Sequence, residues 1–186
     1  MKQVISVLGD RDVEKNSFKY ELGYRISKAL VDNGYRVLNG GVGTLSRVVY
    51  EGAVSSSQYT EGCVISIVPG FDPSVALEAS DIQIATGLDE YRNVITANTD
   101  AVVAIGGGAG TLTEIAMAWM LKRLIICLKA DGWSGELAGR RIDSRIRYRN
   151  IEEDQCFPAN DEIDVINILA KYLSRYGRRH HGIPKG

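Results

Sequence analysis

A run of glycines followed by threonine and glutamate is the part of this sequence best suited to chemistry. Residues 106–114 read Gly-Gly-Gly-Ala-Gly-Thr-Leu-Thr-Glu and follow the apolar segment 101–105 directly. Glycines let a ligand approach the backbone, and a helix that begins here offers unpaired N–H groups to an anion. The sequence therefore predicts a phosphate site at the start of this helix, with the carboxylate of Glu114 at its rim. Its predicted ligand-binding residues are Gly107, Gly108, Ala109, Gly110 and Thr111.

The same residues permit a purely structural interpretation. Thr111 and Glu114 have the spacing of a capping box, in which both side chains only satisfy backbone N–H groups of their own helix. The number of glycines favours the ligand site, because a capping box does not need them. For Glu114 itself the two interpretations remain open.

Two better-known phosphate motifs are excluded. Thr111 stands where a dinucleotide fingerprint G-x-G-x-x-G needs its third glycine, and no Lys-Ser or Lys-Thr pair closes the loop as in a Walker A motif. The sequence therefore predicts no nicotinamide cofactor and no resident cofactor of another kind. Binding of a phosphate must instead depend on backbone N–H groups and on an arginine from elsewhere.

The surrounding pattern indicates which elements position this turn. Short apolar segments at 4–8, 35–39, 64–68, 81–85, 101–105 and 123–128 alternate with helical patterns. This alternation predicts an α/β fold with a three-layer, doubly wound and mainly parallel sheet of the Rossmann-like type. Residues 1–176 form a single nucleotide-binding domain in this prediction, and 177–186 form a basic flexible tail.

A second glycine turn, at 40–44, also follows a strand and opens a helix. In an open parallel sheet the carboxyl ends of the strands line one ligand crevice. Further ligand-binding residues are therefore predicted at Gly9, Gly40, Gly41 and Gly43.

The helices are predicted from apolar spacing and capping residues. A helix over 17–33 carries the stripe Phe18, Leu22, Ile26, Ala29 and Leu30. Asp89 is predicted to cap a helix with Tyr91, Val94 and Ile95 on one stripe and Arg92 on its flank. Asp161 is predicted to cap a last helix with the stripe Ile163, Ile166, Leu169, Ala170 and Leu173. Between 129 and 157 the periodicity is lost, and 132–135 is predicted to be an ordered loop.

Composition excludes several classes of protein. The 186 residues carry a formal net charge of −1, which gives no general attraction to nucleic acid or to an anionic membrane. No apolar run approaches the roughly 20 residues that span a bilayer. The N-terminus enters a strand at once, so no signal peptide is expected. Three cysteines without metal-type spacing favour free thiols in the cytoplasm.

Metal binding has little basis in this sequence. The adjacent pair His180-His181 lies in the predicted tail and has no supporting ligands. No metal site is predicted.

Residues 105–114 resemble the PGGxGTxxE signature of the LOG family, once called lysine decarboxylase-like. The matching residues are Gly107, Gly108, Gly110, Thr111 and Glu114, while Gly106 replaces the family's proline. Arg92 matches the first residue of the family's Arg-Lys pair, and Asn93 replaces the second. The resemblance covers about residues 1–130. A closer similarity is to Rossmann proteins related to the DNA-processing protein DprA and to molybdenum cofactor carrier proteins.

The resemblance implies a nucleotide-binding protein that is dimeric or larger. LOG enzymes hydrolyse the N-glycosidic bond of nucleoside 5′-monophosphates, so the implied catalytic residues are Glu114 and Arg92. Glu114 would stabilise positive charge on the sugar or orient water, and Arg92 would hold the phosphate or the departing base. Without the resemblance, Arg92 is more readily interpreted as a solvated helix arginine.

The competing hypothesis is a carrier or sensor that holds a phosphorylated cofactor without cleaving it. Asn93 removes a cation that the enzymes keep, and Asp10 and Asp12 would repel a phosphate unless Arg11 compensates. The arginine-rich segment 140–149 could clamp a multiply charged ligand, or it could be a solvated or interface loop. Single-stranded DNA is a third candidate ligand, which the net charge argues against.

Overall fold

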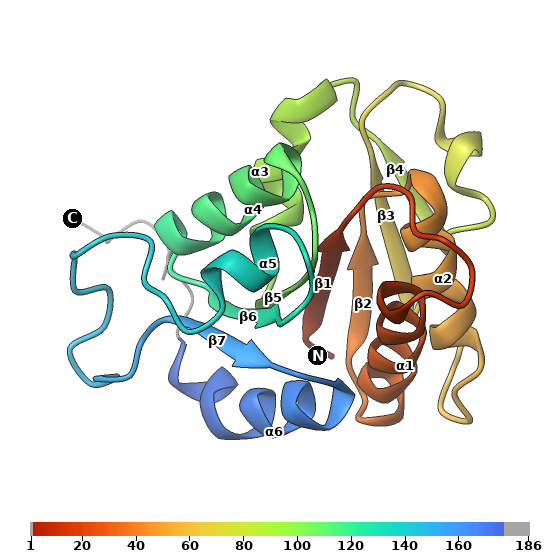
Figure 1. The fold of residues 1–186 in the computed structure, drawn as a ribbon. Helices are drawn as coiled ribbons and strands as arrows, with labels where there is room; N and C mark the ends of the chain where they lie inside the picture. Colours follow the sequence, from red (N-terminus) through yellow and green to blue (C-terminus); the bar gives the residue numbers. More distant parts are fainter. Residues whose placement is uncertain (1, 177–186) are drawn as a thin grey trace, which may run out of the picture.

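The computed structural model describes residues 2–176, so the predicted tail at 177–186 lies outside the described residues. Seven strands form one sheet in the order β4-β3-β2-β1-β5-β6-β7, and every neighbouring pair is parallel. The strands are β1 (Val4–Gly9), β2 (Arg36–Asn39), β3 (Val64–Val68), β4 (Ile82–Ala85), β5 (Ala101–Ile105), β6 (Leu124–Leu128) and β7 (Cys156–Ala159). The predicted single α/β domain with a doubly wound parallel sheet is confirmed (Figure 1).

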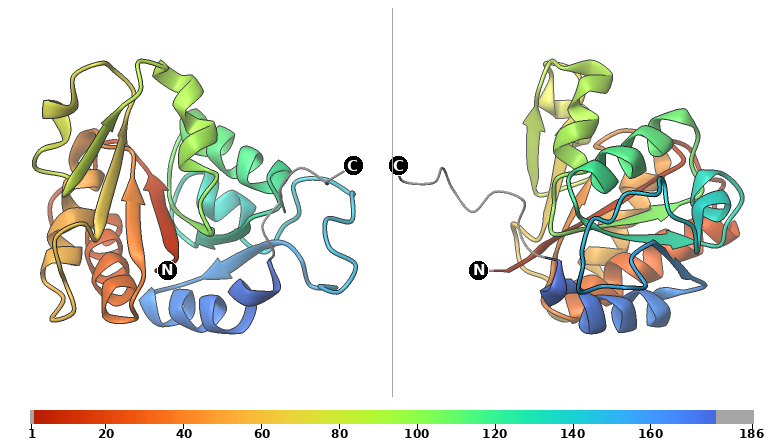
Figure 2. Two further views of the ribbon diagram at one scale, coloured as in Figure 1. Left: turned by 180° about the vertical axis from the view of Figure 1, so that it is seen from behind. Right: turned by 90° about the vertical axis from the view of Figure 1, so that its left-hand side faces the viewer.

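Helices cover both faces of the sheet, as the two views of Figure 2 show. The α-helices are α1 (Phe18–Asp32), α2 (Gly43–Val54), α3 (Asn93–Thr96), α4 (Ala109–Met120), α5 (Trp133–Leu137) and α6 (Glu162–Tyr172). Short 3-10 turns are η1 (Pro73–Ala76), η2 (Asp89–Arg92) and η3 (Leu173–Arg175). Helices α1, α2 and α6 contribute to one apolar core, and α4 and α5, with Ala97 directly after α3, contribute to another on the opposite face.

The central strands read as unbroken apolar runs because both of their faces are covered. Every residue of β5 and β6 is buried, as expected for parallel strands between two helix layers. The edge strand β4 instead exposes Ile82 and Ile84. None of the helices in the described part of the chain is long and apolar enough to cross a membrane.

The sheet order reverses between β1 and β5. From β1 the chain proceeds to β2, β3 and β4 on one side, and then returns to place β5 on the other side. Ligands of doubly wound sheets bind outside the carboxyl ends of the strands at such a point. The α4 turn, by which we mean residues 106–111, follows β5 and so lies at this position (Figure 1).

Two elements in the segment 129–157 escaped the sequence analysis. Residues 133–137 form the short helix α5 where an ordered loop is predicted, and β7 adds a seventh strand. Strand β7 has four residues and contains Pro158, which cannot donate a hydrogen bond to a ladder. Proline is tolerated because β7 is an edge strand.

The predicted stripe of α1 is largely correct. Leu22, Ile26 and Leu30 are fully buried and Ser17 caps the helix, but Phe18 in the first turn is 57% exposed. In α6 the cap by Asp161 is confirmed. The buried face there is rotated toward Val165, Leu169 and Tyr172, whereas Ile163 and Ala170 are exposed.

The helix predicted after Asp89 differs most from the structure. Asp89 has a φ of 50° and begins the 3-10 turn η2 without capping it. The stripe of Tyr91, Val94 and Ile95 is on the surface, while Asn93 and Thr96 are buried. The prediction of a capped helix is therefore wrong, because this segment turns its polar residues inward toward the neighbouring α4.

Candidate functional site

A cavity of about 420 Å³ opens at the carboxyl ends of β1, β2 and β5, and we call it the central cavity. It brings together residues of both predicted glycine turns and both predicted catalytic residues. Its lining includes Gly9, Asp10, Arg11, Gly40, Val42, Pro69, Glu90, Arg92, Asn93, Gly108, Gly110, Thr111 and Glu114.

The start of α4 presents its backbone to this cavity. Gly108 is the N-cap residue and makes no side-chain cap, and Gly108, Ala109 and Gly110 are all exposed. Among the described residues, no acceptor is found for the N–H groups of 108–111. The start of α4 therefore has N–H groups without a partner and the positive end of a helix dipole, the two features that suit an anion.

The first glycines of the turn have a different role. The Gly106 N–H donates to Ser134 Oγ at 2.7 Å, and the Gly107 carbonyl accepts from the Trp133 N–H at 2.9 Å. Both glycines have positive φ, and a Cβ on Gly107 would overlap the Thr111 side chain. Gly106 and Gly107 therefore fix the shape of the turn against α5.

The capping box between Thr111 and Glu114 is not formed. The Thr111 hydroxyl donates to the Gly9 carbonyl at 3.0 Å and so ties α4 to the end of β1. Glu114 turns away from its own helix terminus and accepts from the Thr96 hydroxyl at 2.6 Å. Both residues are buried in the wall of the cavity. The capping-box interpretation of Thr111 and Glu114 is therefore wrong.

Glu114 is a buried carboxyl group, only 6% exposed. Burial raises the pKa of Glu114, while the hydrogen bond from Thr96 and the charge of Arg92 oppose that rise. A raised pKa favours the protonated form and is typical of carboxyl groups that donate or share a proton at a functional site.

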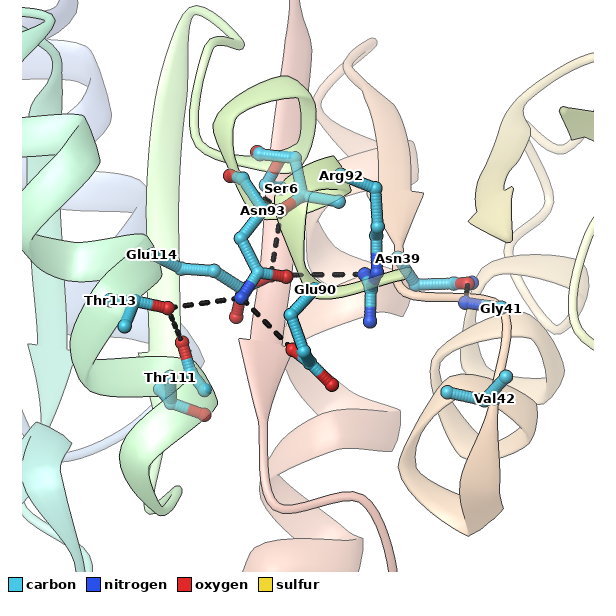
Figure 3. Close-up of polar contacts among 12 residues, drawn as sticks. Ser6, Asn39, Gly41, Val42, Glu90, Arg92, Asn93, Thr111, Thr113 and Glu114 are labelled. Atoms are coloured by element: carbon cyan, nitrogen blue, oxygen red, sulfur yellow. Dashed lines mark hydrogen bonds and ion pairs between the residues drawn. The ribbon is translucent and has the colours of Figure 1, made fainter. Parts of the chain in front are cut away.

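Arg92 lies beside Glu114, with Nη1 3.8 Å from Oε1 (Figure 3). Its side chain is 11% exposed, so it is not a solvated helix arginine. The Nε and Nη1 atoms are buried and have no hydrogen-bond partner in the described chain. A buried guanidinium without hydrogen bonds at these atoms is costly, and Arg92 lines the central cavity, so its charge is suited to an anion there.

Gly40 provides the space that Arg92 occupies. A Cβ on Gly40 would lie 2.9 Å from Arg92 Nη1 and 3.2 Å from Nη2. Asn39 holds this turn in place, because its Oδ1 accepts from the Gly41 N–H at 2.8 Å (Figure 3). The Gly41 N–H is thus used internally and does not face the cavity.

Gly43 is also a close-approach residue. It has a φ of 79°, and a Cβ there would lie 2.0 Å from the Arg11 carbonyl oxygen. At Gly9 a Cβ would lie 2.1 Å from the Ile105 carbonyl oxygen. Of the four glycines predicted outside the α4 turn, Gly9 and Gly40 line the central cavity, whereas Gly41 and Gly43 shape the turn behind it.

A lysine that the sequence analysis did not single out neutralises one acid of the first loop. Lys19 Nζ lies 2.6 Å from Asp10 Oδ2, and the two side chains are 25% and 28% exposed. Arg11, which was expected to compensate, instead approaches Asp12 at 3.9 Å on the surface. No local pattern indicates the Lys19 contact, because the loop from 10 to 17 brings the two residues together.

Asn93 stands where the LOG family keeps a lysine and forms a polar wall of the cavity. Its Nδ2 donates to Thr113 Oγ1 at 3.0 Å and to Glu90 Oε2 at 3.3 Å (Figure 3). This wall links η2 to α4 and separates the central cavity from the surface beyond it.

The arginine-rich segment 140–149 is not part of the central cavity. Arg147 is buried, pairs with Asp154 and stacks 3.7 Å above the centre of the Trp119 ring. Arg145 pairs with Asp143 on the surface. The described residues therefore give no support to a ligand clamp formed by this segment.

The described residues contain no group of side chains suited to bind a metal ion. Within residues 2–176, no three His, Cys, Asp or Glu side chains lie together in a way that could hold a metal ion. The pair His180-His181 lies outside the described residues.

The parallel seven-stranded sheet with a ligand crevice at its switch point defines a Rossmann-like α/β protein. The chain belongs to the SLOG cluster4 family, whose model matches residues 2–157. It is 32% identical to a protein of Archaeoglobus fulgidus over 126 residues. The matched region covers 67% of this chain and 79% of the Archaeoglobus protein. The suspected relation to LOG-like proteins is thus confirmed.

Solved structures agree with this placement. A molybdenum cofactor binding protein from Rippkaea orientalis is 26% identical, with a TM-score of 0.72 over 91% of this chain and 96% of that chain. A molybdenum cofactor carrier protein from Chlamydomonas reinhardtii shares the fold at 22% identity and a TM-score of 0.73, covering 94% and 99% of the two chains. DNA processing protein A of Helicobacter pylori shares the fold at 15% identity and a TM-score of 0.59, covering 94% and 82%.

Proposed function

We propose that the central cavity binds a small phosphorylated ligand of the nucleotide class. One observation carries this proposal: N–H groups without an acceptor at the start of α4 and Arg92, whose Nε and Nη1 make no hydrogen bond, line the same cavity. The two sets come from different elements, and both are suited to an anion. Membership of the SLOG cluster4 family supports a nucleotide-like ligand, as the LOG resemblance implies.

The reaction that best suits Glu114 is hydrolysis of a nucleoside 5′-monophosphate. The C1′–N bond breaks, a water oxygen bonds to C1′, and the base leaves with a proton. The carboxyl of Glu114 stabilises positive charge on the sugar or holds the proton that the base needs. Binding of the phosphate at α4 fixes the sugar relative to Glu114.

A carrier or sensor is the second candidate. Two features favour it: Asn93 replaces a cation of the hydrolytic enzymes, and the structural relatives include proteins described as binding the molybdenum cofactor. Such a protein would use the same donors to hold a phosphorylated ligand without cleaving it. A homo-oligomer, dimeric or tetrameric, and a cytoplasmic location belong to both proposals.

One set of assays tests both candidates. Purified protein is incubated with AMP, GMP and CMP, free base is measured, and binding is followed by calorimetry. Release of base that is lost in Glu114→Gln supports the hydrolase, whereas binding without release supports the carrier. Arg92→Ala should weaken binding of ribose 5-phosphate roughly 10- to 100-fold, the scale of a charge-assisted hydrogen bond. Equal affinity of Arg92→Ala and wild type would remove the basis of both candidates.

A further inference from the structure

A second hollow continues from the central cavity, and we call it the Phe71 cavity. It has a volume of about 410 Å³. Arg11, Val42 and Pro69 line both cavities. The remaining walls come largely from the segment after β3, including Val68, Gly70, Phe71, Asp72 and Val75. A ligand that starts at α4 and crosses the central cavity therefore reaches this hollow without a break.

Phe71 is an exposed aromatic side chain held in a defined place. It is 88% exposed, which for a phenylalanine leaves a large apolar surface in water. Its ring packs on Gly87, where a Cβ would lie 2.2 Å from a ring carbon. Gly87 has a φ of 63°, so glycine is required there both by conformation and by space.

Backbone hydrogen bonds fix the segment that carries this ring. The Gly87 N–H donates to the Gly70 carbonyl at 3.0 Å, and the Asp89 N–H donates to the Pro69 carbonyl at 3.1 Å. The Thr86 N–H and hydroxyl both donate to the Val68 carbonyl. Phe71 therefore presents its free surface from an anchored turn, as a stacking platform does.

We infer that the Phe71 cavity is the subsite for the flat heteroaromatic ring of the ligand. This inference rests on the proposed phosphate site, because the phosphate at α4 sets where the ring lies. The ring stacks on Phe71 beside Val75, while the sugar spans the region of Arg11 and Val42. Stacking of this kind accepts different bases, since every base has a π face.

A third hollow, which we call the Tyr91 hollow, also has an exposed aromatic residue. Tyr91, which is 82% exposed, lines it together with Met117 and Thr113, and it shares Glu90, Asn93 and Gly110 with the central cavity. The hydrogen bonds of Asn93 to Glu90 and Thr113 stand between this hollow and the central cavity. The two hollows differ in their walls: the hydrogen bonds of Asn93 cross the side toward Tyr91, whereas Phe71 stands on an anchored turn, and we therefore assign the ring to Phe71.

The test compares two probes that differ only in the base. Binding of AMP and of ribose 5-phosphate is measured by calorimetry on the full chain. Wild type should bind AMP more tightly than ribose 5-phosphate. The Phe71→Ala variant should lose roughly 5- to 100-fold of the affinity for AMP. Its affinity for ribose 5-phosphate should change less than about twofold. Phe71→Trp should keep the preference for AMP, and Tyr91→Ala serves as the matched control that also keeps it.

Three results would overturn the inference while leaving the phosphate site in place. They are equal binding of the two probes by wild type, an unchanged preference in Phe71→Ala, and loss of the preference in Tyr91→Ala instead. If wild type binds neither probe, the proposed function fails and the subsite fails with it. Because Phe71 is exposed, circular dichroism of Phe71→Ala should match wild type.

Discussion

The guanidinium of Arg92 lies against the α-carbon of Gly40, at a distance that leaves no room for a side chain. The two residues come from η2 and from the turn after β2, and both line the central cavity. The absence of a side chain at Gly40 therefore leaves the space in which the Arg92 guanidinium lies beside Glu114. The second glycine turn thus packs against the arginine that lies beside Glu114.

Gly40→Ala should displace Arg92 and weaken binding of ribose 5-phosphate several-fold, within the roughly 10- to 100-fold available from Arg92 itself. Gly40 lacks a positive φ, so alanine imposes no backbone strain. Calorimetry on Gly40→Ala, Arg92→Ala and the double variant forms the test. In the Arg92→Ala background, Gly40→Ala should have no further effect. An equal loss in both backgrounds would mean that Gly40 acts on the ligand without Arg92.

Titration of Glu114 should be visible in the stability of the fold. Burial raises the pKa of Glu114, so the folded state binds its proton more tightly than the unfolded state does. Stability then falls as pH rises from about 4, the value of an unfolded glutamate, through the raised pKa. The gain in melting temperature of Glu114→Gln over wild type should therefore grow across this window and level off above it. A difference that stays constant with pH would show that the carboxyl titrates normally.

Lys19 should protect the anion site from the charge of Asp10. In Lys19→Ala the carboxylate of Asp10 loses its 2.6 Å partner at the edge of the cavity. Binding of ribose 5-phosphate should weaken by up to about fivefold, the scale of a partly exposed ion pair. The double variant Lys19→Ala with Asp10→Asn should recover most of that loss. Failure to recover would show that Lys19 contacts the ligand directly.

The sequence predicts the part of the site that depends on local order. Strand β5, the glycines and the start of α4 are consecutive in the chain, so their arrangement follows from the apolar run and the turn. The alternation of strands and helices likewise predicts six of the seven strands. Strand β7 is missed because its four residues, one of them proline, carry no periodic signal.

Contacts between segments that are distant in the chain could not be predicted from the sequence. Thr96 bonds to Glu114 across 18 positions, and Arg92 meets the turn at Gly40 across the crevice. The buried side of α3 is a further example. The apolar residues of this segment predict a buried apolar stripe, but the side chain that faces α4 is the polar Asn93, which donates a hydrogen bond to Thr113. In each case the partner is chosen by the sheet order and not by spacing along the chain.

The segment 140–149 should act on stability and not on the ligand. Arg147 and Asp154 are 4% and 2% exposed, and Arg147 Nη1 also donates to the carbonyls of Trp119 and Arg123. Removing one partner leaves a buried charge, so Arg147→Ala should cost about 3–5 kcal/mol in denaturant unfolding.

The surface variant Arg145→Ala is the matched control, since its pair with Asp143 lies at the surface and should contribute little to stability. Under conditions where both variants are folded, their affinity for ribose 5-phosphate should equal that of wild type. A selective loss of affinity in Arg147→Ala at full folding would instead place this segment in the ligand site. That outcome would support a ligand clamp formed by this segment. It is not the expected outcome, because the described contacts of Arg147 all lead away from the central cavity.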